Sequence, residues 1–187
     1  MDEIRTERLV LRNFKATDAQ HLLAYLRDPR PSCFLSQRLH NLEDAKAEVI
    51  KRGGSDDYIA VYSSEHGGVI GDLFAIADEE GDTLSVGWNF NGDYAGRGYA
   101  QEAARALFRW LFVEKQIRRL YAYVEDNNLA SQKLCERLGM RREGLFLEFI
   151  SFTKDEDGHP LYENTMQYGL LRREWQARTQ GCVDKEA

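Results

Sequence analysis

Three glycines between a strand-like run and a helix-like run form the first candidate site of this 187-residue chain. Gly92, Gly96 and Gly98 follow the apolar run 84–90, and apolar residues at helical spacing begin near Tyr99. Glycine lets a backbone turn sharply and approach a ligand without a Cβ clash. The first amides of a helix lack partners inside it and lie at the positive end of its dipole. The pattern predicts a phosphate site made of backbone N–H groups, with an ordinary glycine-containing turn as the alternative.

Two familiar phosphate motifs do not fit this loop, because it lacks the Lys-Ser/Thr ending of a P-loop and has Gln101 at the last position of G-x-G-x-x-G. Segment 95–103 instead resembles the acyl-coenzyme A loop of the GNAT superfamily of N-acetyltransferases, Gln/Arg-x-x-Gly-x-Gly/Ala. Gly98 and Ala100 match its two small positions, whereas Ala95 replaces the usual Gln or Arg. The resemblance implies that amides of this loop hold the coenzyme A pyrophosphate, with the binding residues Ala95, Gly96, Arg97, Gly98, Tyr99, Ala100 and Gln101.

Two further stretches carry the same resemblance. Residues 128–140 are similar to the GNAT segment Asn-x-x-Ser/Ala…Tyr-Glu-Lys-Leu-Gly-Phe. The family's Asn meets the pantetheine arm of the coenzyme, and Asn128 matches it; Asn128 also stands where a helix N-cap is expected, and both roles can hold. Segments 6–12, 142–145 and 168–175 resemble the branch that acetylates the N-termini of ribosomal proteins. The resemblance therefore covers nearly the whole chain.

The residues and the resemblance agree on an α/β fold. Strand-like runs between 58 and 90 are joined by short turns, which predicts antiparallel pairing, and the strand–helix–strand unit from 84 to 124 predicts a parallel pair. The resemblance implies a single GNAT domain over residues 1–187. Its fold is of the α+β type, with a mixed, mostly antiparallel sheet of about seven strands, a splayed parallel pair and helices on both faces. The glycine loop then lies beside the slot between the parallel strands.

Acyl transfer to an amine benefits from a proton donor to the departing thiolate. The usual GNAT acid is a Tyr, and Cys135 occupies its position. Ser131 lies one helical turn earlier and matches the Ser proposed as donor in the ribosomal branch, so we predict Ser131 as the catalytic acid and as a coenzyme contact. The alternatives are a Ser131 hydroxyl that bonds the backbone, and Cys135 as an acyl-accepting nucleophile.

The reaction also needs a neutral amine and a donor to the thioester oxygen. The usual acidic position on the fourth strand is Ser85, so the general base must lie elsewhere. A water chain to Glu148 or Asp72 could serve, and we predict Glu148 in preference to Asp72. A solvated or ion-paired strand residue is the alternative for Glu148. For the thioester oxygen we predict a backbone N–H near Asn89 or Phe90, where strand pairing stops.

The acceptor side is expected near the first two helices, which cover it in the GNAT resemblance. Trp88 and Phe90 are expected to pack in the core, and both can also form a wall of the slot. Arg97 either contacts a phosphate or is a solvated charge in the loop. The candidates for contact with the acceptor lie before the second helix and are Phe34, Leu35, Arg38 and His40. The alternative is that this segment is a packed or solvated connector.

The amino-acid composition limits the kinds of partner that this protein is expected to bind. The net charge of −6 argues against non-specific binding to nucleic acid and suits a cationic or amine partner. The three cysteines, Cys33, Cys135 and Cys182, are scattered and match neither a disulfide framework nor a zinc-binding pattern. We therefore expect a reducing compartment and no bound metal. The first residues do not read as a signal peptide, and no apolar run reaches membrane length. We therefore expect a cytoplasmic protein without a membrane partner.

The predicted function is transfer of acetyl from acetyl-CoA to a primary amine, directly in a ternary complex. The acceptor is a protein N-terminus or a small cationic amine, and the sequence does not name it. Two alternatives stay open: a coenzyme A binding protein that no longer catalyses, and a transferase that uses another acyl-CoA such as succinyl-CoA. Exposed edge strands make a homodimer a further expectation.

Overall fold

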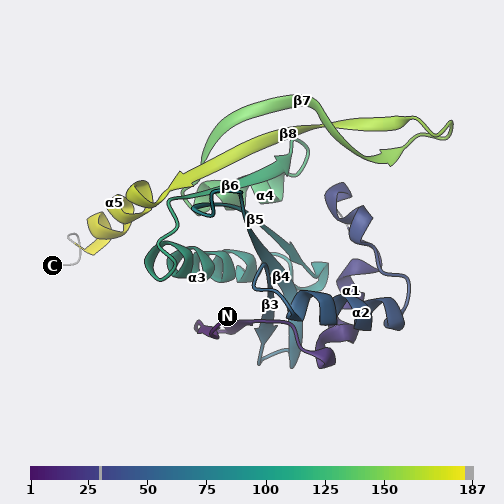
Figure 1. Ribbon diagram of the computed structural model, residues 1–187, viewed down its shortest axis with the longest axis horizontal. Helices are drawn as coiled ribbons and strands as arrows, with labels where there is room; N and C mark the ends of the chain where they lie inside the picture. The colour runs from purple at the N-terminus through teal and green to yellow at the C-terminus, as the bar shows by residue number, and fades with distance from the viewer. Residues whose placement is uncertain (30, 184–187) are drawn as a thin grey trace.

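The computed structural model describes residues 1–29 and 31–183 and contains one open eight-stranded sheet (Figure 1). The order of the strands across the sheet is β1-β2-β3-β4-β5-β6-β8-β7. The strands are β1 (Ile4–Arg5), β2 (Leu9–Arg12), β3 (Tyr58–Ser63), β4 (Gly68–Ala77), β5 (Thr83–Phe90), β6 (Arg119–Glu125), β7 (Arg141–Lys154) and β8 (Pro160–Leu171).

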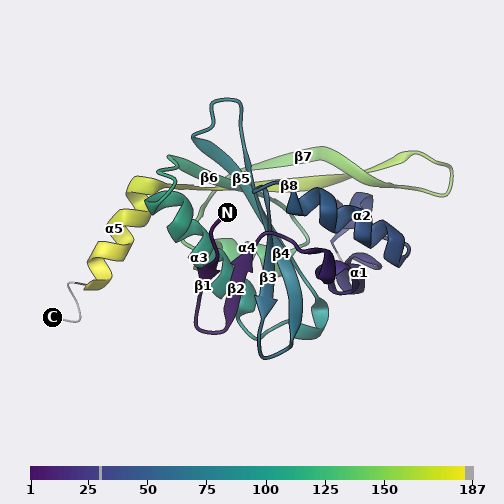
Figure 2. The same ribbon diagram turned by 60° about the horizontal axis from the view of Figure 1, so that its bottom comes forward.

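Helices connect and cover these strands (Figures 1 and 2). The α-helices are α1 (Ala19–Leu26), α2 (Leu42–Gly53), α3 (Tyr99–Val113), α4 (Leu129–Arg137) and α5 (Arg172–Val183). Short 3-10 helices are η1 (Ala16–Asp18), η2 (Ser32–Gln37) and η3 (Gly92–Tyr94). The sheet has eight strands, against about seven expected, and its opening segment forms the β1–β2 hairpin, in which Thr6 N bonds Leu9 O at 3.0 Å.

The expected splayed parallel pair is β5 and β6. The two strands pair only over Thr83–Ser85 and Arg119–Tyr121, and every other neighbouring pair in the sheet is antiparallel. Since β5 continues to Phe90 and β6 continues to Glu125, the strands run on unpaired and separate. A slot therefore opens at their carboxyl ends, next to the glycine loop.

Alternation along β3 shows that helices cover both faces of the sheet. Ile59 and Val61 belong to the core cluster that contains the buried side of α3, whereas Ala60 belongs to the cluster formed by α1 and α2. Successive side chains of a strand point to opposite faces, so the two clusters lie on opposite sides. The predicted layering, with helices on both faces, is confirmed.

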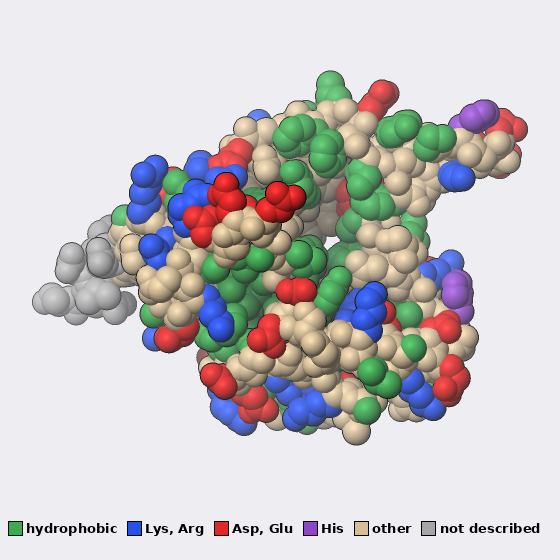
Figure 3. Space-filling view, in the orientation of Figure 1, with side chains coloured by type: hydrophobic (Ala, Val, Ile, Leu, Met, Phe, Trp, Pro, Cys, Tyr) green, Lys and Arg blue, Asp and Glu red, His purple; other side chains and the backbone are tan. Residues whose placement is uncertain are grey.

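The distal part of the β7–β8 hairpin, residues 145–165, projects from the body as an arm (Figures 1 and 2). Its register is irregular, and Glu148 lies in one bulge with φ of +48°. Figure 3 shows hydrophobic side chains along the arm and a hollow between the arm and the body. The exposed apolar residues of the arm are Leu145, Phe146, Leu147, Phe149, Ile150, Leu161 and Tyr162.

None of the helices within residues 1–29 and 31–183 combines the length and the apolar character needed to span a bilayer.

Candidate active site

The glycine loop has the open backbone that the sequence predicts. Gly96 and Gly98 have φ of +76° and +80°, a region in which other residues are strained. A Cβ added at Gly96 would meet open space, and one at Gly98 would have only Arg8 within 4 Å, at 3.6 Å. Gly98 is the N-cap of α3 and offers no side chain to the first amides of that helix. The loop thus leaves room and backbone donors for an anion.

The N-terminal segment holds this loop in place through Glu102, in the first turn of α3. The Glu102 carboxylate accepts from the Thr6 hydroxyl at 2.6 Å, from Arg8 N at 3.0 Å and from Arg8 Nε at 2.7 Å. Arg8 also donates to the carbonyl of Arg97 at 3.1 Å. Burial alone would raise the pKa of Glu102, but the hydrogen bonds from Thr6 and Arg8 bring it below its ordinary value. The opening Thr-x-Arg therefore serves to position the loop.

The unpaired edge of β5 supplies backbone donors to the slot. Asn91 N bonds Ile70 O of β4 at 2.9 Å, and amide directions alternate along an antiparallel strand. The N–H groups of Trp88 and Phe90 therefore face away from β4, toward the slot, while the Asn89 N–H faces β4. The Asn89 side chain is buried, and its Nδ2 has no partner among the described residues.

Ser131 lies at the same slot. Its hydroxyl oxygen accepts from the indole Nε1 of Trp88 at 3.1 Å, and its amide donates to the side chain of Asn128 at 3.1 Å. Asn128 is thus the N-cap of α4, as one of its two expected roles requires. Because Trp88 donates the hydrogen in this contact, the hydroxyl hydrogen of Ser131 is free for another acceptor.

Cys135 packs in the core one turn after Ser131 and is fully buried. Burial raises the pKa of its thiol to about 12. A nucleophilic cysteine needs a thiolate, which this environment disfavours. The burial of Cys135 therefore argues against its role as an acyl-accepting nucleophile.

A pocket of about 280 Å³ opens between β5, β6, η2 and the arm. It contains four of the predicted residues, Phe34, Trp88, Asn128 and Ser131, together with Ser85. Its other walls are mainly apolar and include Phe74, Val86, Ala122, Tyr123, Val124, Phe149, Ile150 and Phe152. The predicted acceptor wall and the predicted acid therefore share one cavity.

The predicted base, its alternative and one acceptor-side residue do not line this pocket. Glu148 is exposed on the bulged part of β7, where its amide bonds Asn164 at 3.0 Å, and it does not line the pocket. Arg38 is exposed and donates to the carbonyl of Arg27 at 2.8 Å. Asp72, the second candidate base, is a buried residue of β4, and its carboxylate accepts from Arg52 at 3.1 Å.

Sequence reasoning missed Glu125, the last residue of β6, which is 5% exposed and lines the pocket. It accepts from the Ser32 hydroxyl at 2.8 Å and from Cys33 N at 2.9 Å. The same hydroxyl lies 2.7 Å from the carboxylate of Glu163 on β8. Burial and Glu125 raise the pKa of the Cys33 thiol. Glu125 could have been predicted from the sequence, because it is an acidic residue at the carboxyl end of a parallel strand, where ligands often bind.

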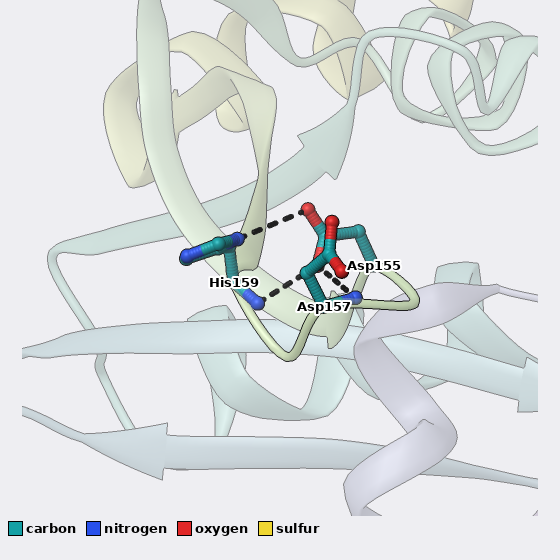
Figure 4. A group of neighbouring side chains, drawn as sticks. All are labelled: Asp155, Asp157 and His159. Atoms are coloured by element: carbon teal, nitrogen blue, oxygen red, sulfur yellow. Dashed lines mark hydrogen bonds and ion pairs between the residues drawn. The ribbon is translucent and has the colours of Figure 1, made fainter.

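A second group of ionisable residues lies in the turn at the tip of the arm (Figure 4). Asp155, Asp157 and His159 are all exposed. The Asp155 carboxylate accepts from Asp157 N at 3.0 Å and from His159 N at 2.8 Å, which fixes the turn. These bonds explain the cluster as turn structure.

Known proteins resemble this chain in sequence and in fold. A family model described as an acetyltransferase (GNAT) domain matches residues 8–141. The uncharacterized N-acetyltransferase YnaD of Bacillus subtilis (strain 168) is 31% identical over 173 residues, which are 92% of this chain and 98% of YnaD. A GNAT-family acetyltransferase structure from Bacillus anthracis has a TM-score of 0.79 at 27% identity and covers 92% of this chain and 99% of its own.

One further structure concerns the fold alone, because its sequence identity is 19%. It is the ribosomal-protein-S5-alanine acetyltransferase from Vibrio fischeri, with a TM-score of 0.69, covering 94% of this chain and 99% of that chain.

Proposed function

Because the chain belongs to the GNAT acetyltransferase family, we propose that it moves the acetyl group of acetyl-CoA to a primary amine by direct transfer in a ternary complex. The observation that carries the proposal is one shared slot. The uncapped start of α3, the free amides of β5 and the Ser131 hydroxyl all lie at the splayed ends of β5 and β6. The donor and the acceptor then meet between them, with residues 1–187 acting as one domain.

The glycine loop fits the pyrophosphate of coenzyme A. Its left-handed glycines leave open space above the backbone, and the helix dipole of α3 favours negative charge there. Arg97, exposed in the loop, adds a cation for a phosphate. Asn128 lies at the slot to meet the pantetheine arm while it caps α4. The proposed binding residues are Asn89, Phe90, Ala95, Gly96, Arg97, Gly98, Tyr99, Ala100, Gln101, Asn128 and Ser131.

Acetyl-CoA supplies an acyl group on a thiolate that leaves readily. The backbone N–H groups of Trp88 and Phe90 face the slot and are suited to stabilise charge on the thioester oxygen. Ser131 holds a hydroxyl hydrogen free to pass to the sulfur as the bond to the acyl group breaks. Glu148 stays a predicted base, although it is exposed outside the pocket, and Glu148→Gln tests that role.

The acceptor belongs to one of two classes, a protein N-terminus or a small cationic amine. The walls of the proposed acceptor site include Phe34 and Trp88, while Arg38 points elsewhere. The ribosomal branch of the family rests on sequence motifs, and it is part of this proposal. The cytoplasm, a reducing compartment, is the proposed location.

The experiment that tests the activity is release of free thiol from acetyl-CoA in the presence of amine panels: N-terminal peptides, polyamines and arylalkyl amines. Turnover with any panel supports the transferase. Tight binding of coenzyme A without turnover of any amine would instead support the alternative, a binding protein that no longer catalyses. Parallel reactions with succinyl-CoA decide the acyl group.

We also propose a homodimer that forms through the arm. Strand β7 is the edge of the sheet, and such an edge presents unpaired backbone groups. The arm adds contiguous exposed apolar side chains, with Leu147 at 70% exposure. A second copy that covers them removes apolar surface from water.

A further inference from the structure

Glu125 is a buried carboxylate in an apolar pocket. Among the described residues that line the pocket, it alone carries a charge. Its side chain is almost inaccessible, since the residue is 5% exposed. Removing a carboxylate from water is costly unless hydrogen bonds or an opposite charge compensate for it. The position of Glu125 therefore calls for a partner.

The partners seen within the chain do not supply a positive charge. The Ser32 hydroxyl lies between Glu125 and Glu163, 2.8 and 2.7 Å from their carboxylate oxygens. A hydroxyl has one hydrogen, so it can donate to only one of the two carboxylates. Among the described residues, no Lys, Arg or His forms an ion pair with either carboxylate. Within the described residues, the pair has no positive charge beside it, and its donors are the shared Ser32 hydroxyl and, for Glu125, the Cys33 amide.

An independent observation points to a ligand at the same place. Thr165 lies opposite Glu125 in the β6–β8 register and lines the same pocket. It is 4% exposed, and its hydroxyl Oγ1 has no hydrogen-bond partner within the described chain. Buried polar atoms are nearly always paired, so an orphaned oxygen beside a carboxylate marks a place for a donor. An ammonium group carries three N–H donors and one positive charge.

The walls of the pocket define the rest of the ligand. Aromatic rings of Phe34, Phe74, Trp88 and Phe149 line it, and ring faces attract cations as well as apolar groups. The volume of about 280 Å³ lies just below the range of small-molecule sites, about 300 to 1,000 Å³, which favours a compact ligand. A long polycation would need further carboxylates, and a polar sugar would need further hydrogen-bond partners.

We infer that Glu125 binds the ammonium group of a compact primary amine with an apolar or aromatic body, which is the acceptor of this protein. This inference rests on the proposed function, because it names the substrate class of the same site. The Cys33 amide, which donates to Glu125 at 2.9 Å, helps to hold the carboxylate in place. Thr165 accepts a further N–H from the ammonium group.

The test is direct binding by calorimetry to the protein saturated with coenzyme A. The probes are 2-phenylethylamine, its neutral counterpart 2-phenylethanol, and spermidine. We expect the wild type to prefer 2-phenylethylamine to both others. Glu125→Gln should lower its affinity about 10- to 100-fold, since hydrogen bonds to charged groups are worth that much, and should leave 2-phenylethanol binding unchanged. Glu156→Gln, in the exposed turn of the arm, is the matched control and should change nothing.

Equal affinity of wild type and Glu125→Gln for 2-phenylethylamine would overturn the inference, as would tighter binding of spermidine than of 2-phenylethylamine. Arg30 lies outside the described residues, so Arg30→Ala is measured in parallel. A tenfold or greater gain in 2-phenylethylamine affinity in Arg30→Ala would mean that the chain's own arginine occupies the site, which also contradicts the inference.

Coenzyme A affinity and thermal unfolding of Glu125→Gln verify that the fold is intact. If the variant does not fold, Thr165→Val replaces it and should weaken 2-phenylethylamine binding at least threefold. Failure of the proposed function looks different: no amine of any class would release thiol from acetyl-CoA. Turnover that is unaffected by Glu125→Gln would be consistent with the transferase activity and would contradict only the assignment of the acceptor.

Discussion

The indole Nε1 of Trp88 lies 3.1 Å from the hydroxyl oxygen of Ser131, and this contact joins β5 to α4 across the slot. The two residues are 43 positions apart in the chain. The donated hydrogen bond orients the Ser131 hydroxyl and frees its hydrogen for the slot. This relationship gives the proposed acid a defined direction.

Loss of the Ser131 hydroxyl should lower the rate of acetyl transfer and leave the binding of coenzyme A intact. We expect Ser131→Ala to lower kcat by about 10²- to 10⁴-fold, because a general acid contributes in that range. The affinity for coenzyme A should stay nearly unchanged, since the donor acts on charge that forms late in the reaction. Steady-state kinetics with the best amine, together with calorimetry, measure both quantities.

Two matched variants separate the alternatives for this step. Trp88→Phe keeps an aromatic wall and removes one hydrogen bond, so kcat should fall less than about tenfold. Cys135→Ala should cost some stability, because the thiol is buried, and little rate. An inactive Cys135→Ala with an acetylated thiol trapped on the wild-type protein, detected by mass spectrometry, would replace direct transfer by a covalent route.

The glycine loop predicts a specific sensitivity to side chains. Gly98→Val places a branched side chain at φ of +80°, over the backbone proposed to hold the pyrophosphate. We expect a large loss of coenzyme A affinity by calorimetry. Gly67→Val is the control for backbone strain, because Gly67 has φ of +66° and open space in the turn before β4. Unchanged affinity in Gly98→Val would rule out this loop as the site.

Phosphates should carry much of the coenzyme affinity. Dephospho-coenzyme A should bind more weakly than coenzyme A, and free pantetheine more weakly still, because the helix N-terminus and Arg97 interact with negative charge. Affinity should also fall as salt increases. A pantetheine affinity equal to that of coenzyme A would contradict the glycine-loop site.

Asp72 should make stability depend on pH. Burial raises its pKa to about 6, even though Arg52 and Tyr25 stabilise its charged form. The native state therefore holds a proton that the unfolded chain, with an ordinary pKa near 3.8, has released. Stability from this residue is present below about pH 4 and is lost as pH rises toward 6.

Urea unfolding of wild type and Asp72→Asn between pH 4 and 6.5 isolates that contribution. The variant should be less stable overall, because the buried Arg52 and Tyr25 each lose a hydrogen bond to the Asp72 carboxyl group. The difference in unfolding free energy between the two proteins should shrink as pH rises. A difference that grows with pH would mean that Asp72 has a lowered pKa instead.

The proposed dimer depends on the apolar arm. Leu147→Glu places a charge on its most exposed apolar residue and should convert a dimer into monomers in sedimentation experiments. Ile50→Glu on α2 is the matched control, since Ile50 is 69% exposed but lies away from the arm, and it should not change the mass. A monomeric wild type at micromolar concentration would refute the dimer.

Local sequence was sufficient for the parts of the site that are contiguous in the chain. Gly96 and Gly98 stand before an apolar helical pattern, and this order alone predicts an uncapped helix start behind a turn. Asn128 and Ser131 are three residues apart at the start of a helix, so one capping bond relates them. The parallel direction of β5 and β6 also followed from a strand–helix–strand order, because such crossovers fix strand direction, whereas the splay was implied by the family resemblance.

Only the tertiary structure decided which distant side chains meet. Ser32 lies 93 residues from Glu125 and 131 from Glu163, and their meeting depends on where η2 lies against β6 and β8. The bulged register of β7 moved Glu148 out of the pocket, and a strand pattern of period two does not reveal a bulge. Contacts between segments far apart in the chain arise from the packing of whole elements, so residue spacing could not specify the acceptor site.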